Sequence, residues 1–99
     1  NVSVNDSQKF LAGGGNDLEI YHDGSNSRIE NNTGHLYIRN DANNSDIIFQ
    51  NDDGSGGVTE YFRVDGSTDS PQTIFPDNSQ LNFGNGLDLR IIHDGTNST

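Results

Sequence analysis

Two histidine-aspartate pairs have the clearest potential for chemistry in this sequence. They are His22-Asp23 and His93-Asp94, and each follows an alternating apolar stretch and precedes a glycine. Because imidazole is a good transition-metal ligand, a threefold assembly could bring three such histidines to one axis and bind a metal ion there. The alternative is a histidine that hydrogen-bonds a neighbouring carboxylate or carbonyl and so holds a tight turn. We favour the turn.

Two stretches rich in glycine and aspartate could hold calcium. Residues 13–17 resemble part of the glycine-rich nonapeptide of calcium-binding β-rolls, but no tandem copies follow nine residues apart. Residues 52–56 offer oxygen ligands, but the terminal glutamate of an EF-hand loop is missing. We therefore interpret both stretches as turns.

The sequence contains no motif that indicates catalysis. Nucleophile elbows, phosphate-binding loops and zincin helices are all absent. A Ser/His/Asp set can be selected from any chain this rich in serine and aspartate, so its presence carries no weight. We expect no enzymatic activity and no cofactor; a β-helical polysaccharide hydrolase or lyase is the least favoured interpretation.

The chain is organised by a repeat. Residues 13–27 recur as residues 84–98, with an offset of 71 residues that places His22 on His93. This period exceeds the roughly 20 to 50 residues of common solenoid repeats, so each unit should contain several strands. We expect one full unit over residues 1–71 and the start of the next over 72–99, with 1–28 equivalent to 72–99. The chain is then a piece of a longer tandem protein.

Composition limits the partners and the core. The net charge is −10 with only five lysines and arginines, which argues against nucleic acid and against anionic membranes. No apolar run is long enough to insert into a membrane, and no cysteine is present. Hydrophobic residues make up 28% of the chain, well below the globular norm, so copies must associate to bury enough surface.

Short alternating runs separated by turn residues predict an all-β fold. The expected class is a β-rich fibre module of short antiparallel strands, arranged like a β-solenoid or β-prism or as a small sandwich, and stabilised by oligomerisation. The expected strands span residues 2–4, 9–12, 18–23, 28–30, 35–40, 46–51, 58–65, 72–75, 80–84 and 88–94.

Turn chemistry should fix the connections. Each Asp-Gly pair can supply a positive φ at the glycine and a carboxylate that caps the turn. Pro71 and Pro76 flank residues 72–75, which suits an edge strand or a unit boundary. The expected structural turn residues are Gly13, Gly15, Asp23, Gly24, Asp53, Gly54, Asp65, Gly66, Gly84, Gly86, Asp94 and Gly95.

Alternation also assigns side chains to faces. Leu18, Ile20 and His22 share one face of their strand, and their counterparts Leu89, Ile91 and His93 share the same face in the second copy. We expect this repeated face to lie inside. Strict alternation also places Val58, Glu60, Phe62 and Val64 together on one face of their strand.

The order of these motifs resembles a known family. The runs are Asp17 to Ser27, Gly34 to Ile38, Asp46 to Gly57, Glu60 to Ser67 and Phe75 to Asn78. They resemble tandem repeats of large virion structural proteins from cyanophages and other marine tailed phages, with related marine bacterial sequences. Ile92 and Thr96 depart slightly from that pattern.

The resemblance implies a structural repeat module of a tail fibre or extracellular filament that builds an elongated homo-oligomer, often a trimer. It supplies no catalytic residues. The partner would then be the protein itself, with a host-surface glycan as a further possibility. The alternative function is an adhesin-type β module that binds carbohydrate or calcium through tyrosines or acidic turns.

Overall fold

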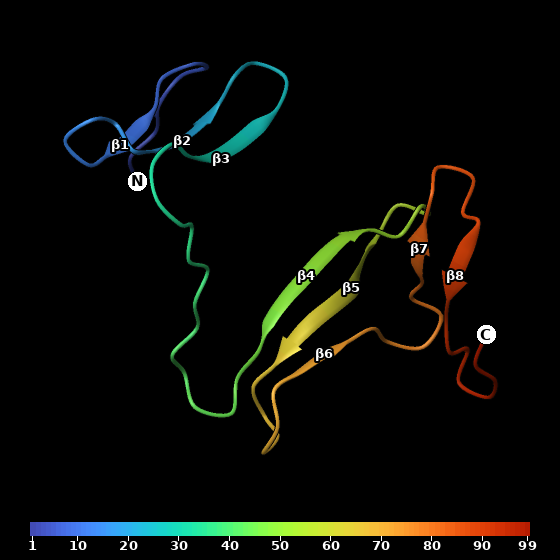
Figure 1. Ribbon diagram of the computed structural model, residues 1–99. Coiled ribbons are helices and arrows are strands. Elements are labelled where there is room, and N and C mark those ends of the chain that lie inside the picture. The colour runs from blue at the N-terminus through green and yellow to red at the C-terminus, as the bar shows by residue number, and fades with distance from the viewer. The chain divides into compact units, whose positions relative to one another are not determined.

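The computed structural model describes residues 1–99 and contains only β-strands, turns and loops (Figure 1). This confirms the all-β class with short antiparallel strands. No helix capable of crossing a membrane is found. The strands are β1 (Phe10–Ala12), β2 (Leu18–His22), β3 (Ser27–Asn31), β4 (Ile47–Asp52), β5 (Val58–Asp65), β6 (Gln72–Ile74), β7 (Leu81–Phe83) and β8 (Leu89–Ile91).

The chain divides into two compact units, Asn1–Ile38 and Arg39–Thr99. This division separates regions by their internal packing, whereas the expected units of residues 1–71 and 72–99 follow the sequence period. The period-based division stays a prediction.

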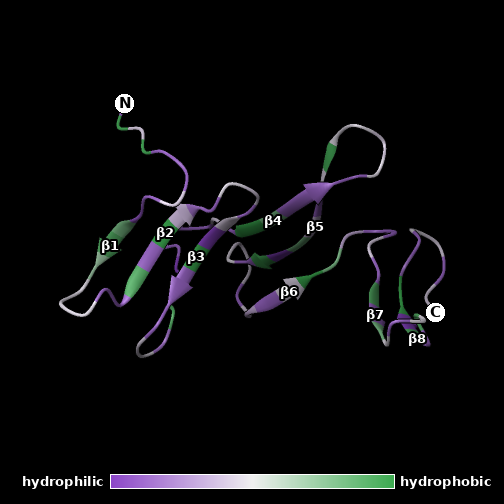
Figure 2. Cartoon of the chain, turned by 90° about the horizontal axis from the view of Figure 1, so that it is seen from above, coloured by the Kyte–Doolittle hydropathy of each residue, from purple (hydrophilic) through white to green (hydrophobic).

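The first unit contains a single antiparallel sheet in the order β1-β2-β3. Its register aligns Phe10 with Ile20 and Ile20 with Ile29, so these three side chains form a row across one face. Leu11, Glu19 and Glu30 form the adjacent row on the opposite face. Hydrophobic and hydrophilic residues accordingly alternate along β2 (Figure 2). The sheet is amphipathic because residues alternate between its two faces along each strand and the register aligns the apolar ones across neighbouring strands.

The second unit contains one three-stranded sheet in the order β4-β5-β6 and a two-stranded sheet of β7 and β8. All of its strand pairs are antiparallel. The strand β6 between Pro71 and Pro76 lies at the sheet edge, as expected, because a proline cannot donate to a strand on either side.

A β-bulge corrects the face assignment of β5. Phe49 pairs with Phe62, but the next residue of β4, Gln50, pairs with Glu60, so Tyr61 is the extra residue. Glu60 and Phe62 therefore lie on opposite faces, and the expectation that they share one is wrong. The bulge instead places Glu60 beside Arg63, whose Nη1 lies 2.8 Å from a Glu60 carboxylate oxygen. The expectation from alternation is wrong here because the bulge adds one residue to β5, which moves the side chains beyond it to the other face of the sheet.

Three stacked phenylalanines bind β4, β5 and the end of β6 together. The ring centroids of Phe49 and Phe62 are 4.5 Å apart with an interplanar angle of 12°, and those of Phe62 and Phe75 are 5.5 Å apart at 22°. This stack is the best-packed apolar feature of the second unit. Phe49 and Phe75 are still each 38% exposed.

The chain has no hydrophobic core of its own. No hydrophobic residue is buried, and the one buried residue is Asp65. The repeated face was expected inside, but Ile20 is 42% exposed and Ile91 52% exposed. That expectation is wrong within each unit, because neither unit supplies a second layer that covers this face.

Eight of the ten expected strands are present with small differences at their ends. The exceptions are residues 2–4 and 35–40, which form no strand. Both segments alternate in sequence, but alternation creates a strand only where a neighbouring strand supplies hydrogen bonds. The ring of His35 instead packs edge-on against Tyr37, with centroids 6.2 Å apart.

Replacing Phe62 with alanine should destabilise the β4-β5-β6 sheet by about 2 kcal/mol, because Phe62 contacts both other rings of the stack. Urea denaturation followed by far-UV circular dichroism measures this change. Tyr37→Ala is the control, since Tyr37 is 80% exposed. Equal losses in the two variants would contradict a stabilising role for the stack.

Candidate functional site: the repeated sheet face

The two ends of the chain build the same hairpin. Its tip turns on Gly13 with a φ of 93° in the first copy and on Gly84 with a φ of 85° in the second. The fourth residue of each tip, Asn16 or Leu87, has a φ of 56° and donates its N–H to the carbonyl of that glycine. Leu87 holds this left-handed conformation although a leucine rarely adopts it. The geometry therefore follows the repeat even where the residue type changes.

Glycine is favoured at the tip chiefly by its positive φ, and an aspartate side chain also lies close to it. A Cβ at Gly13 would collide with the carboxylate of Asp17, and a Cβ at Gly84 would lie 2.9 Å from that of Asp88. Gly15 and Gly86 do not have a positive φ; the positive φ lies at the next residue, Asn16 or Leu87.

Three of the four Asp-Gly turns have a positive φ at the glycine. Gly24, Gly54 and Gly95 have positive φ. Gly66 does not, so the positive φ expected there is wrong. At Gly66 the restriction is the close approach of the Ser45 carbonyl, which a Cβ would overlap. Close packing, which the sequence does not reveal, explains this glycine.

The carboxylates of Asp23 and Asp94 cap their own turns. Asp23 Oδ1 accepts the N–H groups of Ser25 and Asn26 at 2.9 and 2.7 Å. Asp94 Oδ1 accepts the equivalent N–H groups of Thr96 and Asn97, also at 2.9 and 2.7 Å. These backbone donors, together with Arg28, lower the pKa of Asp23 to about 2. Backbone donors likewise lower the pKa of Asp94.

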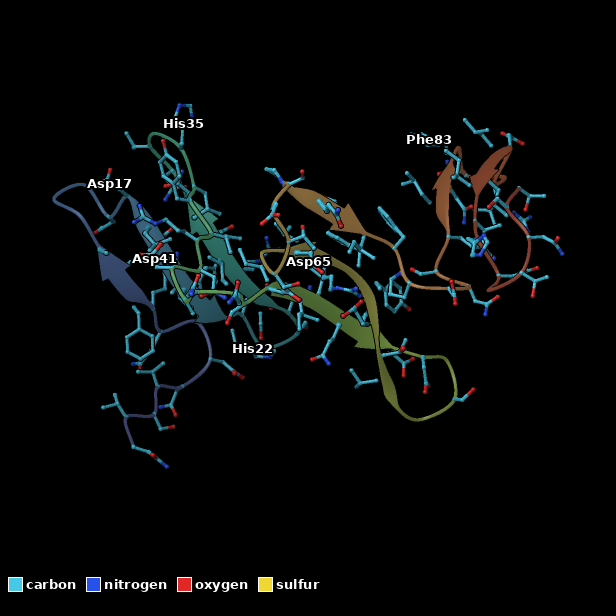
Figure 3. All side chains as sticks on the ribbon, turned by 90° about the horizontal axis from the view of Figure 1, so that it is seen from below. Asp17, His22, His35, Asp41, Asp65 and Phe83 are labelled. Atoms are coloured by element: carbon cyan, nitrogen blue, oxygen red, sulfur yellow. The ribbon has the colours of Figure 1, made fainter.

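Asp53 and Asp65 cap turns in the second unit. Asp53 Oδ1 accepts the N–H groups of Ser55 and Gly57, which lowers the pKa of Asp53. Asp65, at the end of β5 (Figure 3), accepts the hydroxyl and N–H of Ser67 and the guanidinium of Arg63. These donors also lower the pKa of Asp65, with the Ser67 hydroxyl contributing most. The burial of Asp65 is therefore compensated by hydrogen bonds.

Each repeated histidine contacts a serine of its own hairpin. His22 Nδ1 lies 3.0 Å from Ser27 Oγ, and His93 Nδ1 lies 2.8 Å from Ser98 Oγ. His22 stands at the end of β2 (Figure 3). No group of three or more His, Cys, Asp or Glu side chains gathers anywhere in the chain as a metal site. The structure thus brings each histidine to a serine of its own hairpin.

An equivalent depression lies on both hairpins. The depression of the first has a volume of about 420 Å³ and that of the second about 240 Å³. Seven pairs of repeat-equivalent residues line them: Val4 and Phe75, Phe10 and Leu81, Ile20 and Ile91, Tyr21 and Ile92, His22 and His93, Ser27 and Ser98, and Arg28 and Thr99. The repeat therefore reproduces a surface as well as a backbone.

An apolar surface adjoins each depression and supplies part of its lining. We define the N-face as Phe10, Leu18, Ile20 and Ile29, and the C-face as Leu81, Phe83, Leu89 and Ile91. Each set lies on one side of its sheet, as the strand register requires. On the N-face Ile29 is 66% exposed, and on the C-face Leu89 is 55% exposed. Every member of the two faces except the half-buried Leu18 is exposed, so neither unit covers its own face.

The opposite face of the first sheet is polar and internally neutralised. Lys9 Nζ lies 2.9 Å from Glu19 and 4.5 Å from the centroid of the Tyr21 ring. Tyr21 donates its hydroxyl to Glu30, and Arg28 lies 3.5 Å from Glu30. Ion pairs between partly exposed side chains contribute little to stability, but they mark this face as the solvated one.

Sequence reasoning identified the turn residues and the face carrying the histidines, but it did not identify the depressions. Phe10 and Leu81 could have been found by aligning the strand that precedes each glycine-rich tip, since both are apolar at the same repeat position. Ile29 could not have been assigned, because its place in the row depends on the register of β3.

Comparison with known proteins gives no relative. The chain matches no family model, no curated protein and no solved structure.

Replacing Asp23 with alanine should destabilise the first hairpin more than replacing it with asparagine. Alanine removes the acceptor for both turn N–H groups, whereas asparagine keeps an oxygen there and loses only the charge. Thermal melting at pH 7 compares the two variants. Asp69→Ala is the control, because Asp69 is exposed and lies outside the Asp-Gly turns. A greater loss in Asp23→Asn would contradict the capping role.

Acid should weaken the same turns. The folded-state pKa of Asp23 is about 2, below its usual 3.8, so the folded state binds the proton more weakly than the unfolded state. The resulting stabilisation is complete above about pH 4 and is lost as the pH falls from there toward 2. Side-chain carboxyl shifts in an NMR titration measure this directly. An Asp23 titration midpoint near 4 would contradict it.

Proposed function

We propose that the chain is a structural repeat module of a fibre, which builds an elongated homo-oligomeric or filamentous assembly of the kind found in virion tail fibres and extracellular filaments. The observation that carries the proposal is an apolar sheet face that occurs twice and is uncovered both times. A module with such faces is incomplete alone and becomes stable when further copies cover them.

Charge and turn structure also suit a repetitive assembly. Fifteen acidic residues against five basic ones keep a repetitive β-protein soluble, and many of the carboxylates are used in turns. Strand edges and apolar faces are aggregation hazards in a β-protein, so acidic turns help to restrict contacts to the intended surfaces. The resemblance to tandem virion repeats points to the same kind of assembly.

Sedimentation velocity over a range of concentrations, combined with negative-stain electron microscopy, tests the proposal. We expect elongated oligomers or filaments at micromolar concentration. Glycan-array binding and melting with and without calcium distinguish a spacer from an adhesin, since a spacer should respond to neither. A compact, cooperatively folded monomer at every concentration would overturn the proposal.

A further inference from the structure

We infer that the N-face and the C-face are the surfaces through which copies of this chain bind one another, sheet face against sheet face. The inference rests on the proposed function and identifies its contact surface. Two amphipathic sheets pack naturally in this way, about 10 Å apart, with interdigitating side chains. Here the two layers of each sandwich would come from different molecules.

The first unit shows why the covering layer must come from elsewhere. It contains one sheet, and the residues that surround that sheet include no second strand layer. The row of Phe10, Ile20 and Ile29 is thus exposed at 51, 42 and 66%. Three neighbouring apolar side chains, open to water along one row, mark a contact site.

The chemistry of the faces favours a second copy as the occupant. The chain carries a net charge of −10, so two copies repel each other over most of their surfaces. The in-register positions of the N-face and C-face are free of carboxylates: besides the apolar residues already defined, they hold Ala12, His22, Ser27 and Asn31 on the first sheet. These faces are therefore where copies can approach without burying like charges.

Repetition gives a second argument for self-association. The depressions use equivalent residues, so a side chain that fits one has a similar receiving surface on the other. The more exposed apolar side chains, such as Ile29 and Phe83, are available to fill a facing depression. Two such faces on each molecule allow growth in two directions, which a fibre requires.

The chain offers a matched pair of residues for the test. Phe10 and Leu11 are neighbours in β1 and are 51% and 50% exposed, but Phe10 belongs to the N-face and Leu11 to the opposite face. Phe10→Lys should weaken association roughly a hundredfold or more in sedimentation equilibrium, because a lysine would be desolvated in the interface. Leu11→Lys should leave association unchanged. Ile91→Lys tests the C-face in the same way.

A cysteine variant keeps the test independent of folding losses. The natural chain has no cysteine, so a single introduced cysteine reports its own surroundings. A thiol reagent should modify Ile29→Cys more slowly in the associated than in the dissociated protein, whereas Leu11→Cys should react equally fast in both; equal protection of the two cysteines would contradict the inference. Far-UV circular dichroism of each variant shows whether the β-structure is retained.

The possible outcomes separate this inference from the proposed function. If the natural chain associates and Phe10→Lys and Ile91→Lys associate equally well, the contact surface lies elsewhere and the inference fails while the fibre module stands. If the natural chain is monomeric at every concentration, the faces are covered within one chain or not at all, and both fail. Selective loss in the face variants, with Leu11→Lys unaffected, supports the inference.

Discussion

The structure depends on one constraint: within its unit, no second layer of secondary structure packs against the apolar face of the sheet. A stable domain packs at least two layers around a core, because an apolar sheet face must be removed from water. Here the strands satisfy their backbone hydrogen bonds within each sheet, and the turns satisfy theirs through aspartate carboxylates. Each unit therefore forms its own hydrogen-bonded strands and turns, but it does not bury its own apolar face. This separation explains how a well-defined backbone coexists with the absence of any buried hydrophobic residue.

Much of this fold could be predicted from sequence because it is local. Asp-Gly turns, glycine-rich tips and period-two alternation act over a few residues, and β5 was expected with the bounds it has. The failures involve contacts between distant residues. Alternation predicted strands at residues 2–4 and 35–40, but no partner strand is present there. The bulge at Tyr61 and the close approach of Ser45 to Gly66 are also set by neighbours that the sequence does not place.

The candidate surface was predictable in part for the same reason. The face shared by Leu18, Ile20 and His22 follows from alternation, and its recurrence follows from the repeat. Its exposure does not follow, because burial depends on whether a second layer exists. The depression also requires β3, whose register brings Ile29 alongside Ile20. The sequence thus indicated which side chains are equivalent in the two hairpins. The structure adds that most of these side chains are exposed to solvent within their units.

The differences between the two hairpins separate the positions that vary between the copies from those that stay the same. On the solvated face, Lys9 and Glu19 of the first copy become Gln80 and Arg90 in the second, so an ion pair there is replaceable. On the apolar face, Ile20 becomes Ile91 and stays exposed. Each of these side chains leaves about half of its surface open within its own hairpin. The proposal that another molecule covers the face explains why the position stays apolar in both copies.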